Sequence, residues 1–182
     1  MSVADSYLKD IIRTYKNHQT MGEKAIAQVK DDAALHTQID PGSNSIAVIV
    51  KHVAGNLRSR FTDFLTTDGE KPDRNRDGEF EMPARASRDE ILKWWSEGFR
   101  TVIAAIEAMK PEDVDRTVFI RSEAFLALEA INRSVAHTAY HTGQIVYVAR
   151  HLASGQWTSL SIPKGKSKEA AVGDFKTKGL AR

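Results

Sequence analysis

The sequence of 182 residues contains no cysteine. It therefore has no disulfide framework, no cysteine-ligated zinc site and no cysteine nucleophile. Long apolar runs are also missing, because the longest, such as residues 46–50, are far shorter than the ~20 residues that a membrane-spanning helix needs. The first residues lack the basic stretch, apolar block and cleavage site of a secretory signal. We therefore expect a cytoplasmic protein that does not cross a membrane.

Neither sign of charge dominates, since 26 basic and 24 acidic residues give a formal net charge of +2. Residues 164–182 contain six basic and two acidic residues, so this end carries +4 and residues 1–163 carry −2. A short terminus dotted with lysine is more often a solvated end than a nucleic-acid-binding surface, so we do not expect nucleic acid as a partner. The length fits one domain, which we place at residues 1–163, followed by a basic C-terminal tail at 164–182.

Four segments repeat apolar residues at the three- and four-residue steps of an amphipathic helix. The first runs from Val3 to about residue 30, and the second from Ile46 to about residue 65, with Asn44 or Ser45 as its N-cap. The third opens at a capping box of Ser87 and Glu90 and runs to about residue 109. The fourth runs from about residue 127 to about residue 155.

The segments between these helices differ in character. Residues 66–86 form a long polar connection without periodicity, and connections of this length are usually functional or disordered. Residues 116–125 carry the β-branched and aromatic side chains of a small β-hairpin. The predicted fold is all-α: an antiparallel four-helix bundle with one long connection and a possible small β-hairpin before the last helix.

Several common catalytic motifs are absent. Residues 165–167 match the end of a phosphate-binding loop, but Leu160 stands where the loop requires its first glycine. No histidine has a glutamate three residues before it, so the Glu-x-x-His ligands of a di-iron bundle are missing. The nucleophile elbow G-x-S-x-G is missing too.

Three histidines form a candidate metal site. His137 and His141 lie four residues apart in the last predicted helix, the spacing with which two imidazoles can hold one metal ion. His52 lies close to the apolar face of the second helix. If these two helices are neighbours, the three rings can converge and leave an open coordination position, as in catalytic metal sites. The alternative is that each ring is a core residue with its own hydrogen-bond partner. The remaining histidines show no such pattern: His18, His36 and His151.

The sequence around these histidines resembles the DinB-like superfamily. The similarity lies in residues 44–47 and 51–56 and in residues 137–145, which carry the pattern H-x-x-x-H-x-G-Q. The resemblance implies an antiparallel four-helix bundle, often a homodimer, in which His52, His137 and His141 bind a divalent metal, commonly zinc or nickel. Three further segments are similar to a largely uncharacterised branch of the superfamily: residues 64–72, 74–77 and 157–163.

The resemblance implies two kinds of activity, thiol-dependent transfer or isomerisation and metal-dependent hydrolysis. In both, a metal lowers the pKa of a thiol or water so that the nucleophile exists near neutral pH. Because the chain has no cysteine, a thiol would have to come from a low-molecular-weight cofactor. We expect a divalent-metal-dependent thiol S-transferase or hydrolase acting on an unknown small molecule. The alternative is a non-catalytic, stress-associated metal-binding or dimerisation bundle.

A few other residues are candidates for supporting roles. Gln144, Asn56 and Arg76 could contact a metal ligand or the substrate. Arg74, Asn75 and Arg76 could also clamp an anionic substrate, although a solvated charged loop explains them as well. The adjacent Trp94 and Trp95 would point about 100° apart on a helix, so both cannot face one core, and one could lie in a homodimer interface.

Overall fold

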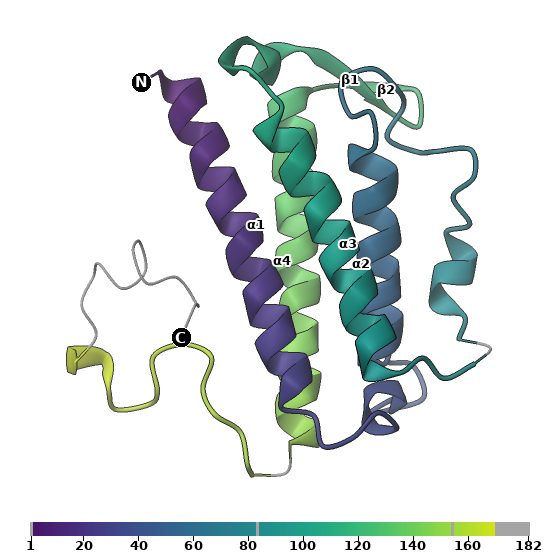
Figure 1. The fold of residues 1–182 in the computed structure, drawn as a ribbon, viewed down its shortest axis with the longest axis vertical. Helices are drawn as coiled ribbons and strands as arrows, with labels where there is room; N and C mark the ends of the chain where they lie inside the picture. The colour runs from purple at the N-terminus through teal and green to yellow at the C-terminus, as the bar shows by residue number, and fades with distance from the viewer. Residues whose placement is uncertain (1, 83, 154, 170–182) are drawn as a thin grey trace.

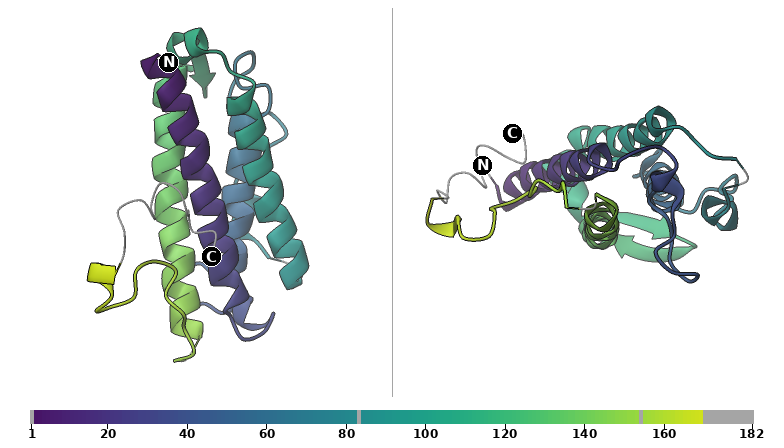
Figure 2. Two further views of the ribbon diagram at one scale, coloured as in Figure 1. Left: turned by 60° about the vertical axis from the view of Figure 1, so that its left-hand side comes forward. Right: turned by 90° about the horizontal axis from the view of Figure 1, so that it is seen from below.

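The structure is a computed structural model that describes residues 2–82, 84–153 and 155–169 (Figure 1). Its four long helices are α1 (Val3–Ala27), α2 (Ile46–Phe61), α3 (Arg88–Glu107) and α4 (Ala127–Leu152). α1 and α4 run in one direction, and α2 and α3 run in the other (Figures 1 and 2). The predicted all-α four-helix bundle is therefore confirmed. Among the described helices, none is long and apolar enough to cross a membrane.

Side-chain caps fix where the helices begin. Ser45 accepts a hydrogen bond from the backbone N–H of Val48 and caps α2, so of the two predicted caps it is Ser45 that acts. The capping box of Ser87 and Glu90 opens α3 as predicted. α2 ends at Phe61, earlier than predicted, because the chain turns just beyond it through Asp63, whose φ of 49° is left-handed.

The bundle core is built around aromatic side chains that are completely buried. Tyr15 packs edge-on against Phe99, and Trp95 also packs against Phe99, with ring centroids 4.6 Å apart. The Trp95 indole N–H donates to the carbonyl of Gln19 at 3.0 Å. The neighbouring Trp94 is only partly buried and lines a pocket between α2 and α3. The two tryptophans thus face different surroundings, as their spacing predicts, and a role in dimerisation stays a prediction.

The connection between α2 and α3 comprises residues 62–87, and its described part, 62–82 and 84–87, returns along the outside of the bundle. α3 begins at the end of the bundle where α2 begins, so the chain must travel back along α2, about 24 Å for its 16 residues (Figure 1). The short 3₁₀-helix η2 (Asp77–Phe80) lies in this stretch. The Lys51 ammonium of α2 donates to the carbonyls of Gly78 and Glu81, both at 2.7 Å. These bonds hold η2 against α2.

A small hairpin precedes α4, and a C-terminal segment follows it. β1 (Thr117–Ile120) pairs antiparallel with β2 (Glu123–Leu126), which confirms the predicted hairpin before the last helix. Before these strands lies η3 (Pro111–Asp115), and earlier lies η1 (Ala34–His36). After α4, Trp157 packs against the core, and η4 (Ser167–Glu169) ends the described chain. The predicted basic tail, residues 164–182, lies outside the described residues from 170 onward.

Candidate metal centre

The structure brings His52 of α2 together with His137 and His141 of α4. Each ring offers one nitrogen, and these three nitrogens all lie within 4.8 Å of one another. The ring centroids are 4.6–5.2 Å apart, so each imidazole contacts the other two. α2 and α4 are neighbours in the bundle, and this is the condition under which the three rings were expected to converge.

The Nε2 atoms of the three rings lack ordinary hydrogen-bond partners. His52 Nε2 and His137 Nε2 face each other at 3.2 Å, where at most one of the two atoms can carry a proton and donate. His141 Nε2 is buried and has no hydrogen-bond partner among the described residues. Buried polar atoms are normally paired, so this arrangement fits a cation that would accept the three lone pairs.

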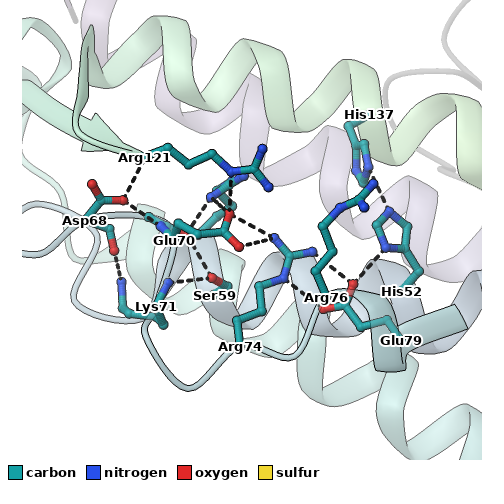
Figure 3. A network of polar contacts seen from close by, with 12 residues as sticks. His52, Ser59, Asp68, Glu70, Lys71, Arg74, Arg76, Glu79, Arg121 and His137 are labelled. Atoms are coloured by element: carbon teal, nitrogen blue, oxygen red, sulfur yellow. Dashed lines mark hydrogen bonds and ion pairs between the residues drawn. The ribbon is translucent and has the colours of Figure 1, made fainter. Parts of the chain in front are cut away.

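Glu79 orients the ring of His52 from the connection. Its Oε2 lies 2.8 Å from His52 Nδ1, and the side chain is nearly fully buried (Figure 3). Arg74 donates to the same carboxylate through Nε at 2.8 Å and Nη2 at 2.9 Å. A carboxylate at the outer nitrogen favours the tautomer with a proton on Nδ1, which leaves the Nε2 lone pair free for a metal.

A glycine in α2 makes the approach of Glu79 possible. A Cβ at Gly55 would lie 2.4 Å from Glu79 Oε1, which is closer than real atoms pack. Gly55 is one turn from His52, so the carboxylate crosses the helix surface where the missing side chain leaves space. We conclude that α2 is shaped to receive this residue of η2.

Ion pairs extend from Glu79 toward the hairpin. Arg74 also approaches Glu70 at 3.4 Å, and Arg121 pairs with Glu70 at 3.3 Å (Figure 3). Glu70 also pairs with Arg60 at 3.0 Å. The Arg74 side chain is almost fully buried between the two carboxylates. Arg74 is therefore neither the substrate clamp nor the solvated loop residue that the sequence offered as alternatives. Asn75 accepts a hydrogen bond from the backbone N–H of Gly78 and stabilises the turn into η2.

The other candidates occupy different surroundings. Gln144 Oε1 lies 2.8 Å from His141 Nδ1 and can orient that ring as Glu79 orients His52. Asn56 is buried one turn beyond His52 on α2. Arg76 is half-exposed, with its guanidinium 5.5 Å from the ring of Phe80. Sequence reasoning missed Glu79 and Phe80, because both lie in a polar stretch without periodicity.

The model of a family described as "Protein of unknown function (DUF1572)" matches residues 2–166. The chain belongs to this family. No curated protein matches it. The matched range includes all four helices, the connection and the three histidines, so in this family member the match spans the whole candidate centre.

Burial and charge keep two of the three rings neutral. Burial, reinforced by the neighbouring histidines, lowers the pKa of His137 to about 3. Burial also lowers the pKa of His141, to about 4, although its hydrogen bond to Gln144 works in the other direction. Burial alone would raise the pKa of Glu79, but hydrogen bonds from His52 and Arg74 outweigh it and hold that pKa below its ordinary value. At neutral pH the centre therefore offers imidazole lone pairs beside an ionised, paired carboxylate.

Proposed function

We propose that the chain is a divalent-metal-dependent enzyme of the DinB-like superfamily, of the thiol S-transferase or hydrolase type. The observation that carries this proposal is the set of three imidazole nitrogens within 4.8 Å of one another, supplied by two neighbouring helices. Three neutral nitrogen ligands with an open position are typical of catalytic zinc sites, whereas structural sites close all four positions. Imidazole also suits nickel, so zinc and nickel are the expected metals.

Each residue of the centre has a task in this proposal. His52, His137 and His141 hold the metal, while Glu79 and Gln144 fix the orientation of two of the rings. When bound, the metal would lower the pKa of a coordinating thiol or water, so that the nucleophile exists near neutral pH. A thiol would come from a low-molecular-weight compound, since the chain has no cysteine.

Metal analysis tests the proposal directly. The protein is purified without chelators or affinity metals, and its metal content is measured for wild type, His141→Ala and His151→Ala. His151 is an exposed residue of the last turn of α4 and serves as a matched control. We expect close to one divalent ion per chain in wild type and in His151→Ala, and little in His141→Ala. Wild-type protein without metal that also fails to take up zinc or nickel would contradict the proposal.

Cobalt substitution separates the two activity types. A small thiol that coordinates cobalt should produce a sulfur-to-metal charge-transfer band, because a bound cation favours the thiolate. The band should disappear in His137→Ala. Cobalt binding without the band would support a water-activating or structural site instead, and would favour the hydrolase or the non-catalytic alternative.

We also propose that the protein is a homodimer, as the family resemblance implies. Light scattering at high micromolar concentration should then give about twice the chain mass of 20.2 kDa. A monomeric mass under these conditions would contradict the dimer without affecting the metal centre, because all three histidines come from one chain.

A further inference from the structure

Two aromatic side chains lie against the histidine cluster and remain partly open to solvent. Phe80 of η2 stacks on His52, with ring centroids 4.8 Å apart. Tyr140 of α4 lies 4.1 Å from the ring of His141 and 5.2 Å from that of His137. Both are among the exposed large side chains of the described chain. The cluster therefore has an apolar wall from the connection and another from α4.

Arg76 differs from the other arginines near this centre. Arg60, Arg74 and Arg121 all pair with Glu70, and Arg74 also pairs with Glu79. Arg76 pairs with its neighbour Asp77 at 3.7 Å, and those side chains are 50% and 95% exposed. An ion pair that is so open to water contributes little. Arg76 thus keeps a guanidinium that another anion can engage.

The position of Arg76 places this charge beside the candidate metal site. Its guanidinium lies 5.5 Å from the ring of Phe80, which itself stacks on His52. Figure 3 shows the side chain reaching from the connection toward the side on which His52 and His137 lie. The Arg76 guanidinium is therefore adjacent to the aromatic walls and on the same side of the connection as the histidines.

The charge of a loaded centre would favour anions. Three neutral imidazoles leave the double positive charge of a divalent ion uncompensated, and the charge of Glu79 is already shared with Arg74. We propose that Arg76 determines specificity by binding an anionic group, such as a carboxylate, that the substrate carries beyond its metal-binding atom. The carbon chain between the two groups would lie against Phe80 and Tyr140. This inference rests on the proposed metal centre, and it applies to a thiol and to a hydrolysed substrate alike.

Metal-binding probes that differ in one group can test the proposed role of Arg76. Butanohydroxamic acid and succinic monohydroxamic acid bind metals through the same head group and differ only in a terminal methyl or carboxylate. Their affinities are measured on cobalt-loaded protein from the shift of the visible cobalt bands. We expect wild type to prefer the carboxylate probe by about three- to tenfold, the range for one partly exposed charge-assisted contact.

Variants of Arg76 make the test specific. Arg76→Gln should abolish the preference for the carboxylate probe while leaving the affinity for butanohydroxamic acid within about twofold of wild type. Arg76→Lys should retain part of the preference. Arg100→Gln, an exposed arginine of α3, removes the same charge elsewhere and should keep the wild-type preference. 4-Aminobutanohydroxamic acid should bind wild type most weakly of the three probes and gain affinity in Arg76→Gln.

The outcomes separate this inference from the one it rests on. Protein that takes up no cobalt overturns the metal centre and the inference together. Cobalt uptake with no response to hydroxamates overturns the inference, since the site then has no open position. Equal changes for the methyl and carboxylate probes in Arg76→Gln, or the same loss in Arg100→Gln, overturn the role of Arg76 and leave the metal centre standing.

Discussion

The rings of His52 and His141 are each oriented by a side-chain oxygen at Nδ1, but the two oxygens come from different parts of the chain. The outer nitrogen of His141 contacts Gln144, three residues further along the same helix. The outer nitrogen of His52 contacts Glu79, which is 27 residues away and reaches it from the connection. The comparison shows that one side of the centre is built within a single helix, whereas the other depends on a separate segment that must pack correctly.

The two contacts also differ in strength. Gln144 is a neutral acceptor on an exposed position of α4, while Glu79 is a buried carboxylate held by two further hydrogen bonds from Arg74. Hydrogen bonds to charged groups are roughly twice as strong as neutral ones. We therefore infer that the α2 side of the centre is more rigid and more sensitive to mutation than the α4 side.

The largest effect is expected from removing the charge of Glu79. Glu79→Gln keeps the shape of the side chain but weakens its hold on His52 and leaves Arg74 with less compensation. The affinity for zinc should fall about 10- to 100-fold, the usual range when the partner of a metal-bound histidine is changed. Competition with a chromophoric chelator measures this affinity, once circular dichroism has shown that the variant folds.

Glu81→Gln is the matched control for this experiment. Glu81 is exposed in the same connection, and its contact with Lys51 is through its backbone carbonyl, which the substitution retains. Its zinc affinity should equal that of wild type. If Glu79→Gln binds zinc as tightly as wild type, the α2 side of the centre is not the more sensitive side, and the inferred difference between the two sides is wrong.

The difference between the two sides of the centre also explains which of its residues could be predicted from the sequence. Short-range sequence patterns predict the helices. In α3, for example, Ser87 and Glu90 mark the first turn, and apolar periodicity marks the buried face. The same periodicity places His137 and His141 on one face of α4. Gln144 could be proposed because it shares that face. Each of these inferences needs only residues within a few turns of one helix.

Glu79 could not be found in this way. Its burial depends on the path of the connection, on the space at Gly55 and on the guanidinium of Arg74, none of which has a local signature. In sequence it is one acidic residue among many in a polar stretch, and such residues are usually solvated. Arg74 was misjudged for the same reason, because its partner Glu79 could not be recognised.

The next effect tests whether the space at Gly55 is needed. Gly55→Ala places a methyl group against Glu79 and should displace it, lowering zinc affinity by up to tenfold and the free energy of unfolding by ~1–3 kcal/mol. A Cβ at Gly143 of α4 meets no atom within 4 Å, so Gly143→Ala should instead raise that free energy by up to ~1 kcal/mol. Urea denaturation of both proteins checks the opposite signs, and equal shifts would contradict the close approach of Glu79.

A smaller change in metal affinity is expected on the α4 side. Gln144→Ala removes a neutral acceptor from an exposed position, where water can replace it at His141 Nδ1. Zinc affinity should fall less than tenfold, and less than in Glu79→Gln measured in the same chelator competition. If Gln144→Ala has the larger effect, the ranking of the two sides is wrong.

The smallest effect concerns the outer end of the ion pairs and depends on pH. Burial alone would raise the pKa of Glu70, but the positive charges of Arg74 and Arg60 outweigh it and hold that pKa below its ordinary 4.5. Because the folded protein binds this proton less readily than the unfolded chain, the stabilisation is present above about pH 4.5 and is lost as the pH falls through the lower folded value. Glu70→Gln should therefore reduce the free energy of unfolding by ~1 kcal/mol at neutral pH, and this difference from wild type should shrink as the pH is lowered below 4.5. Urea denaturation with a chelator present, so that metal binding does not contribute, compares the two proteins over a series of pH values from neutral downward. A difference that stays constant with pH would show that the Glu70 carboxylate does not stabilise the connection through its charge, and the rigidity inferred for the α2 side would then depend on Glu79 and Arg74 alone.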